Sequence, residues 1–196
     1  MSVPQTVGVE EALRRVLNRV APLPPEIVLL DRSVGRVVAE TVYSKVDSPS
    51  TDVSRMDGYA VNTSALTSAS MGSPVGFKVM GISAAGEAES NLHVTCSETV
   101  RVLTGAPIPR NADAVIPEER ARVEGDYIWV NRHVPSGSDI LSRGSDLAAG
   151  QPVAVARQLI SPARVGLLAA AGHDGVLVAR NPIVAIVTTG DEVVTP

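Results

Sequence analysis

The stretch SETVRVLTGAPIPRNADAVIP (Ser97–Pro117) shows the pattern that decides the fold of most of this chain. Two short apolar runs, Thr99–Leu103 and Ala114–Ile116, stand on either side of a segment rich in Gly, Pro and Asn. Short apolar runs between turn-forming residues are typical of β-strands joined by tight connections. This stretch therefore predicts strands of a sheet rather than a helix.

The same pattern extends over Met56–Val134. Two more runs, Phe77–Met80 and Tyr127–Val130, lie between turn residues, and no part of this stretch has the periodicity of an amphipathic helix. A loop rich in Ser, Asp, Thr and Pro, Ser44–Ser54, precedes it and is a plausible domain boundary. We therefore expect an all-β domain, a sandwich or a barrel, over residues 46–140.

The segments on both sides of the β-rich stretch mix helices and strands. An apolar stripe predicts a helix over Gly8–Val20. A second helix is expected to begin with Ser161 as its N-cap and to close at Gly172, and its apolar body predicts burial. Residues 1–45 and 141–180 are therefore expected to form one mixed α/β linker domain, which the β domain interrupts. Its strands are expected at Glu26–Leu30, before Val42, at Pro152–Ala156 and at Val176–Ala179.

The segment IVAIVTTGDEVVTP (Ile183–Pro196) has the pattern of the first strand of another domain. Ile183–Val187 is a continuous apolar run, as in a strand buried on both faces of a parallel sheet. It leads into TTGDE, placed where the first loop of an open α/β sheet binds ligands. Such a strand needs neighbours and crossover helices, which do not follow. We expect residues 181–196 to begin a doubly wound α/β domain that is truncated here, within a mixed α+β fold.

Composition argues against several classes of function. The net charge is −4, and the 17 basic residues do not cluster into the basic stripe that nucleic-acid binding requires. Cys96 is the only cysteine, which excludes an intrachain disulfide and fits a reducing compartment. The first residues lack the features of a signal peptide, and no apolar run approaches the length of a membrane span. We expect a soluble cytoplasmic protein that binds neither nucleic acid nor membrane.

Short polar motifs stand out because the common catalytic signatures are absent. There is no phosphate-binding loop of the Walker type, no dinucleotide fingerprint and no zinc motif, and the three histidines lack ligand spacing. Four segments instead place a polar residue beside a turn, and each alone also fits an ordinary turn or loop. They are MDGYAV with Asp57, TGAPIP with Thr104, SRGSDL with Asp146 and TTGDE with Glu192.

Taken together and in order, these motifs resemble those of the molybdopterin molybdenumtransferases, the bacterial MoeA proteins and the related E domain of gephyrin. That family shows S-x-M-D-G-Y-A, then T-G-A-P-x-P with A-D-A-V, then G-x-D-I…R-G-x-D-x-x-x-G, a G-L-L-A helix and V-A-x-x-x-T-G-D/N-E-L. Here they read SRMDGYA, TGAPIP with ADAV, GSDILSRGSDLAAG, VGLLAAAG and VAIVTTGDEV. The resemblance covers nearly the whole chain.

The resemblance implies a molybdenum insertase of molybdenum cofactor biosynthesis. Such an enzyme takes adenylated molybdopterin and molybdate as substrates, cleaves the adenylate with a divalent cation, Mg²⁺, and leaves molybdenum on the dithiolene. It implies a homodimer and molybdopterin adenylyltransferase as an upstream partner. Because the pterin and molybdate bind mainly on the domain that only begins at residue 181, this N-terminal region alone is expected to be inactive.

The resemblance also assigns roles to individual residues. Asp57 and Glu192 are expected to act as metal-binding or water-orienting carboxylates, since phosphoanhydride cleavage calls for carboxylates that hold Mg²⁺. Thr104 is expected to donate a hydrogen bond, and Asp146 to organise its loop. The expected catalytic set is Asp57, Thr104, Asp146 and Glu192, and the expected cofactor-binding set is Thr189, Gly190 and Asp191. Arg55, which replaces the small residue common before M-D-G, departs from the pattern.

Two alternatives to an enzyme remain open at this point. One is a non-catalytic module that dimerises or docks assembly partners. The other is a β-domain that binds a ligand unrelated to molybdenum. The residues that would discriminate between them lie beyond Pro196.

Overall fold

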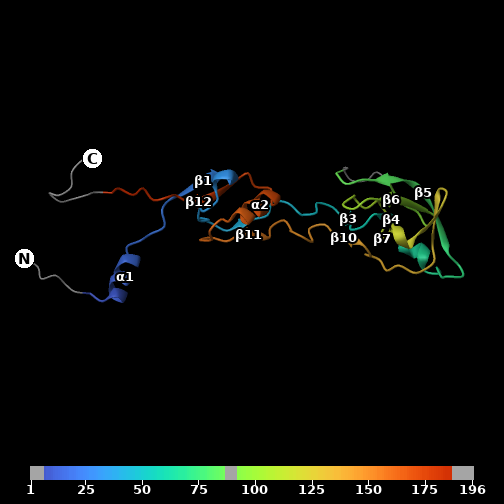
Figure 1. Ribbon diagram of the computed structural model, residues 1–196, viewed down its shortest axis with the longest axis horizontal. Helices are drawn as coiled ribbons and strands as arrows, with labels where there is room; N and C mark the ends of the chain where they lie inside the picture. Colours follow the sequence, from blue (N-terminus) through green and yellow to red (C-terminus); the bar gives the residue numbers. More distant parts are fainter. Residues whose placement is uncertain (1–6, 87–91, 187–196) are drawn as a thin grey trace, which may run out of the picture. The chain divides into compact units, whose positions relative to one another are not determined.

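The protein is described by a computed structural model that covers residues 7–86 and 92–186 (Figure 1). The chain divides into two compact units. The described residues of the first lie within Met1–Val42, Pro152–Ala169 and His173–Pro196, and the second comprises Tyr43–Gln151 and Ala170–Gly172. The expected domains, 1–45 with 141–180, 46–140 and 181–196, remain predictions. Within the described ranges, no helix is long and apolar enough to cross a membrane.

The second unit is built on a six-stranded sheet. Its strand order is β7-β4-β6-β5-β9-β8, and all neighbours are antiparallel except the parallel pair β5 and β6. The four runs that predicted strands all lie within or overlap strands of this sheet. The strands are β4 (Gly58–Val61), β5 (Val75–Ser83), β6 (Glu98–Val102), β7 (Ala114–Pro117), β8 (Arg122–Glu124) and β9 (Tyr127–Val130).

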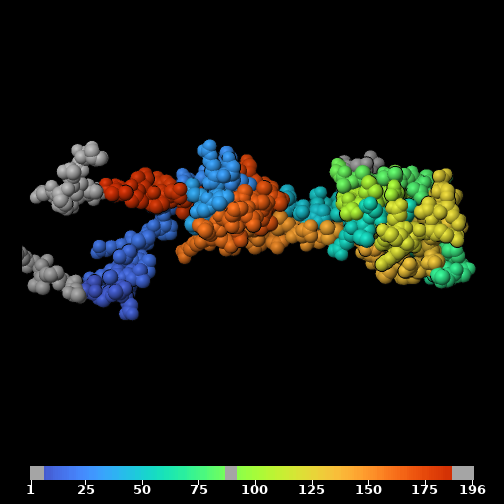
Figure 2. Space-filling model, viewed as in Figure 1, coloured from blue at the N-terminus to red at the C-terminus, as the bar shows by residue number. Residues whose placement is uncertain are grey.

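Both faces of this sheet are buried around β4 and β7, because successive side chains of a strand point to opposite faces. Tyr59 and Ile116 belong to one core cluster, which also holds the fully buried Phe77, whereas Ala60 and Val115 belong to another. In the space-filling view the part of this unit that carries the sheet, coloured teal through green to yellow, is a continuous mass of packed atoms (Figure 2). The central strands therefore form a rigid support for the loops at their ends.

Short elements that the sequence pattern did not predict complete the second unit. They are the 3-10 helices η2 (Thr63–Leu66) and η3 (Glu118–Arg120) and the paired strands β3 (Val53–Ser54) and β10 (Ile140–Leu141). Asn62 caps η2, since its Oδ1 accepts the N–H of Ser64 at 3.0 Å. Elements of two to four residues are too short to show a hydrophobic period, which is why they were missed.

The first unit contains β1 (Pro25–Leu29) and β12 (Gly175–Ala179), two strands that the sequence predicted and that pair in antiparallel fashion. The 3-10 helix η1 (Leu30–Arg32) follows β1, and β11 (Pro152–Ala154) is a further short strand. The strand β2 (Val42–Tyr43) lies at the boundary, with Val42 in the first unit and Tyr43 in the second. Helix α2 spans Pro162–Ala170, and its predicted caps are confirmed. Ser161 Oγ accepts the N–H of Arg164 at 3.3 Å, and Gly172 adopts a φ of 84° after the helix.

Two expectations about apolar segments of the first unit are wrong. Within α2 only Leu168 is buried, because a helix that is apolar on all sides needs neighbours on every side. Ile183–Val187 was expected to be a strand that is poorly packed here because its neighbours are missing. Residues 183–186 form no strand, whereas the exposure of Ile183 and Ile186, 91% and 88%, agrees with the expected poor packing. A parallel strand requires hydrogen-bonding neighbours, and the described part of the chain offers none there. Val187 lies outside the described residues.

Helix α1 spans Val9–Leu17, so it ends earlier than the predicted Val20. Its apolar stripe is present but covers nothing within the described chain: no residue of α1 is buried, and Val9, Leu13 and Val16 are 86%, 57% and 58% exposed. The stripe is thus a feature of the sequence for which the described chain supplies no partner.

Candidate functional site

The sheet brings the first two motifs together. Asp57 directly precedes β4 and Thr104 follows β6, and these strands are antiparallel neighbours with Gly58 paired to Val102. The Oδ1 of Asp57 accepts the backbone N–H of Thr104 at 2.7 Å and its hydroxyl at 2.8 Å. Both residues are exposed. The predicted carboxylate and the predicted hydroxyl therefore form one hydrogen-bonded pair, which we call the Asp57–Thr104 pair.

Glycines next to both residues make this approach possible. A Cβ on Gly58 would lie 2.2 Å from the carbonyl oxygen of Ile116, so no larger residue fits after Asp57. Gly105 has a φ of 81° in a turn that the N–H of Ala106 closes onto the carbonyl of Leu103 at 2.9 Å. The glycine of M-D-G is thus required by the lack of space for a Cβ, and the glycine of T-G-A-P is favoured by its positive φ.

The surroundings of the pair keep Asp57 ionised. The backbone N–H of Thr104, and then its hydroxyl, lower the pKa of Asp57, and the positive charge of Arg101 adds to this effect against the opposing contribution of burial. Arg101 itself forms an ion pair with Glu118, with 2.9 Å between Nη2 and Oε2, which raises the pKa of Arg101. Burial raises the pKa of Tyr59, the cross-strand neighbour of Arg101. The pair therefore carries a negative charge at neutral pH.

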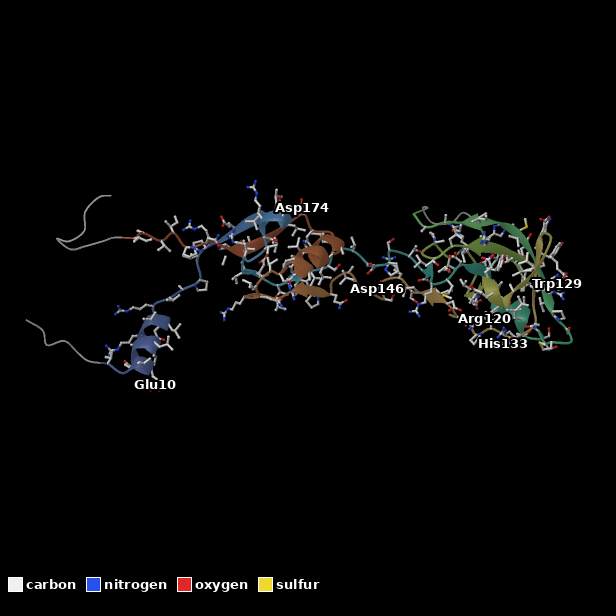
Figure 3. All side chains as sticks on the ribbon, viewed as in Figure 1. Glu10, Arg120, Trp129, His133, Asp146 and Asp174 are labelled. Atoms are coloured by element: carbon white, nitrogen blue, oxygen red, sulfur yellow. The ribbon has the colours of Figure 1, made fainter. Side chains whose placement is uncertain are left out.

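Asp146 is not brought to this pair. Its backbone N–H donates to the carbonyl of Ser48 at 3.0 Å, but its carboxylate is exposed and makes no hydrogen bond or ion pair within the described chain (Figure 3). Two other carboxylates tie its loop: Asp52, whose Oδ1 accepts the N–H of Arg143 at 2.8 Å, and Asp47. Asp47 Oδ1 accepts the N–H of Ala149 at 2.7 Å, and Oδ2 accepts Nε of Arg143 at 2.7 Å. These contacts, the bond to Ala149 first, lower the pKa of Asp47.

Sequence reasoning missed two aspartates that organise this unit. Asp47 lies in a Ser-rich loop with no motif around it, so only the structure could reveal its partners. Asp113 lies inside the ADAV motif, which could have drawn attention to it. Its Oδ1 and Oδ2 accept the N–H and the hydroxyl of Thr63, both at 2.7 Å. Arg101 was missed as well, because a strand position alone does not reveal an ion pair.

The described residues offer one free carboxylate oxygen at the pair rather than a preformed metal cage. They contain no group of three or more His, Cys, Asp or Glu arranged to hold a metal ion. Both bonds from Thr104 fall on Oδ1 of Asp57, so Oδ2 remains available to a ligand. The remaining predicted residues, Thr189, Gly190, Asp191 and Glu192, lie outside the described ranges.

The fold is of the mixed α/β class with a curled sheet, and it is similar to that of solved structures. A MoeA protein of Pyrococcus horikosii, described as a molybdopterin biosynthesis protein, matches with a TM-score of 0.83 at 32% identity over 91% of this chain and 45% of that chain. A second structure, of the protein from Pyrococcus horikoshii OT3, matches with a TM-score of 0.82 at 34% identity over 89% and 46%.

The family follows from the sequence match. The family model described as "MoeA N-terminal region (domain I and II)" matches residues 7–172, and the chain therefore belongs to this family. Curated relatives named molybdopterin molybdenumtransferase are 32% identical over 186 residues in Staphylococcus aureus (strain MSSA476) and 33% identical over 190 residues in Bacillus subtilis (strain 168). In both cases 95% of this chain matches, and it spans 44% of the relative. The predicted resemblance is confirmed.

Proposed function

We propose that this chain is the N-terminal region of a molybdenum insertase that transfers molybdenum from molybdate to adenylated molybdopterin. The Asp57–Thr104 pair carries the proposal, because two motifs 47 positions apart meet in a charged, exposed and rigidly supported pair. The names of the relatives and of the solved neighbours support the same function.

Asp57 fits the role of a ligand to Mg²⁺. This ion is commonly held by one or two carboxylates together with substrate phosphates, rather than by a cage of protein groups alone. Asp57 is ionised, its Oδ1 is fixed by Thr104, and its Oδ2 carries no protein hydrogen bond. When bound, Mg²⁺ supplies neutralisation of the charge that develops on the phosphate oxygens during cleavage.

Thr104 acts on the carboxylate rather than directly on the substrate. A hydroxyl has one hydrogen to donate, and that of Thr104 goes to Asp57 at 2.8 Å. Thr104 is therefore a positioning residue that fixes the orientation of the carboxylate and favours its charged form. Arg101, which is itself paired with Glu118, also favours the ionised form of Asp57.

The other parts of the proposed enzyme come from residues outside the described ranges. We assign the second carboxylate to Glu192 and pterin contacts to Thr189, Gly190 and Asp191. Within the described chain, Asp146 holds its loop only through its backbone N–H, which donates to the carbonyl of Ser48. Because this chain spans 44% of its relatives, we propose that it does not transfer molybdenum alone. From the family resemblance we also propose a homodimer and a cytoplasmic location. Molybdopterin adenylyltransferase is the proposed supplier of its substrate.

The test is to substitute Asp57 in an insertase that carries this region. We expect Asp57→Asn to slow molybdenum transfer by about a hundredfold or more, since a preorganised charge aimed at the reacting group is lost. Transfer is measured as reconstitution of an apo-molybdoenzyme from adenylated molybdopterin, molybdate and Mg²⁺. Asp126→Asn, a change of the same kind at an exposed carboxylate without a described side-chain partner, serves as the matched control. Equal rates for the Asp57 and Asp126 variants would refute the proposed role.

A specific observation also favours a second function, assembly. The apolar stripe of α1 is exposed along its length, with Leu13 and Leu17 at 57% and 61%, and helices with such a stripe bury it against a partner. We therefore propose that α1 contributes to association. Leu13→Asp should shift the mass measured by light scattering toward the monomer, whereas Asn18→Asp, which adds the same group outside the stripe, should not. A mass that Leu13→Asp leaves unchanged would exclude α1 from the interface.

A further inference from the structure

The β-rich unit carries a cationic cavity that shares no lining residue with the Asp57–Thr104 pair. The cavity has a volume of about 500 Å³, and its walls include Trp129 together with Arg120, Arg122 and Arg132. A second cavity of about 250 Å³ shares Arg120 and Arg132 with the first, and both apolar residues and the polar residues His133, Ser138 and Asp139 line it. Volumes of this order suit a small molecule rather than a macromolecular surface. Arg120, Trp129 and His133 of this region are labelled in Figure 3.

The sheet itself builds the aromatic wall. Gly76, Trp129 and Arg122 are cross-strand partners on the adjacent strands β5, β9 and β8, so their side-chain positions share one face. A Cβ on Gly76 would lie 2.9 Å from the indole ring of Trp129, so the ring lies directly over this glycine. Trp129 is only partly buried and lines the cavity. A ring held against the backbone in this way is a fixed platform for stacking.

The arginines of the cavity are mostly not paired with carboxylates of the described chain. Three arginines line the two cavities together with two carboxylates, Glu119 in the first and Asp139 in the second. Arg122 forms only an exposed ion pair of 3.3 Å with Glu124. The side chains of Arg120 and Arg132 have no hydrogen bond or ion pair within the described chain. Arginines with a structural role in this protein are paired: Arg36 with Glu26, and Arg143 with Asp47.

These features identify the chemistry of the ligand. Guanidinium groups recognise phosphate oxygens in a bidentate manner, and an indole ring binds planar rings by stacking. We propose that this cavity binds a mononucleotide or a similar ring-bearing phosphate. The ring lies against Trp129 beside Arg122, and the phosphate lies between Arg120 and Arg132, which line both cavities. This site is independent of the proposed insertase function, since the Asp57–Thr104 pair takes no part in it.

Trp129 is the only tryptophan of the chain, so its fluorescence reports directly on this site. We titrate the 196-residue chain with AMP, with adenosine and with inorganic pyrophosphate, and follow the emission of Trp129. AMP is expected to quench the emission with the lowest dissociation constant of the three, because it alone offers both a ring and a phosphate. Pyrophosphate tests the charge alone, and adenosine tests stacking alone.

Variants assign the binding to this cavity. Arg120→Gln and Arg132→Gln should each raise the dissociation constant for AMP by about tenfold, since each removes a charge-assisted hydrogen bond to the phosphate. Arg110→Gln, the same change at an exposed arginine of the same unit that lines neither cavity, should leave it unchanged. Unchanged emission maxima of the free variants show that they are folded. The proposal is overturned if AMP does not quench, if pyrophosphate or adenosine binds as tightly as AMP, or if the three variants behave alike.

Discussion

The loop around Asp57 and the loop around Asp47 each hold an aspartate with one backbone donor and one side-chain donor. The two loops differ in how these hydrogen bonds are distributed over the two carboxylate oxygens. In each, one backbone N–H and one side-chain donor reach the carboxylate: Thr104 supplies both at Asp57, and Ala149 and Arg143 supply them at Asp47. At Asp57 both bonds fall on Oδ1. At Asp47 they are divided between Oδ1 and Oδ2.

This difference separates a structural carboxylate from one that is available to a ligand. Both oxygens of Asp47 accept hydrogen bonds that join two segments of its unit, and both oxygens of Asp113 accept hydrogen bonds from Thr63. Asp57 is fixed equally well but keeps Oδ2 free. A lowered pKa does not distinguish the two, because the pKa values of Asp57 and Asp47 are both lowered by their hydrogen bonds. The two carboxylates are distinguished by the distribution of their hydrogen bonds over Oδ1 and Oδ2.

The largest expected effect concerns the glycine beside Asp57. In Gly58→Ala the new Cβ would meet the carbonyl oxygen of Ile116 at 2.2 Å, and backbone on both sides must move. We expect the free energy of unfolding to fall by about 3 kcal/mol, as in severe overpacking. Urea denaturation measures this change. Gly72→Ala, where a Cβ meets nothing within 4 Å, is the control, and equal losses in both would show that β4 and β7 are not packed so closely.

The glycine beside Asp47 should matter less. Gly144 has a φ of 69°, and a Cβ there would lie 3.3 Å from Oδ1 of Asp47, a contact that a small shift relieves. Gly144→Ala should therefore cost roughly 1–2 kcal/mol, mainly for the left-handed backbone. The same denaturation experiment ranks it below Gly58→Ala. The reverse order would mean that the Asp47 loop, rather than the Asp57 loop, is the tighter of the two.

Replacing each aspartate by asparagine tests the distribution of bonds directly. In Asp57→Asn the amide oxygen can occupy the Oδ1 position and keep both bonds, so the melting temperature should fall less than in Asp47→Asn. In Asp47→Asn the amide nitrogen must face the guanidinium of Arg143, so a donor meets a donor and the ion pair is lost. We expect a melting temperature lower by about 2–4 °C. Calorimetry that finds both variants equally stable would contradict the division of roles.

Sequence patterns predicted the strands well where turn residues separated them, as at Thr99–Leu103 and Tyr127–Val130, because glycine and proline punctuate the chain locally. They failed for the burial of α2, since a pattern of apolar residues does not say whether a partner is present. Asp57 and Thr104 could be named from their motifs, but their direct bond depends on the register of β4 and β6. Asp47 could not be predicted, because its partners Arg143 and Ala149 lie 96 and 102 positions away.

The smallest expected effect is a change in the pKa of Asp57 itself. Thr104→Val removes the hydroxyl that donates at 2.8 Å but keeps the backbone N–H that donates at 2.7 Å. The backbone bond is the larger of the two contributions that lower the pKa of Asp57. The variant should therefore raise this pKa only part of the way to the ordinary value of an aspartate, about 3.9. A carboxyl titration followed by NMR measures it in both proteins.

The sign of the accompanying stability change follows from the direction of the shift. A carboxyl whose pKa is lower in the folded chain stabilises the fold above its unfolded pKa, and this contribution is lost as the pH falls through the folded value. The melting temperature of the wild type should thus fall more between pH 5 and pH 3 than that of Thr104→Val, because the variant has less of this contribution to lose. Thr67→Val, at an exposed threonine whose hydroxyl contacts only a backbone carbonyl, should match the wild type. If the Asp57 pKa in Thr104→Val stays at the wild-type value, the hydroxyl does not hold the carboxylate. If it returns fully to the ordinary value, the backbone bond depends on the hydroxyl, and the two donors of Thr104 act as one unit.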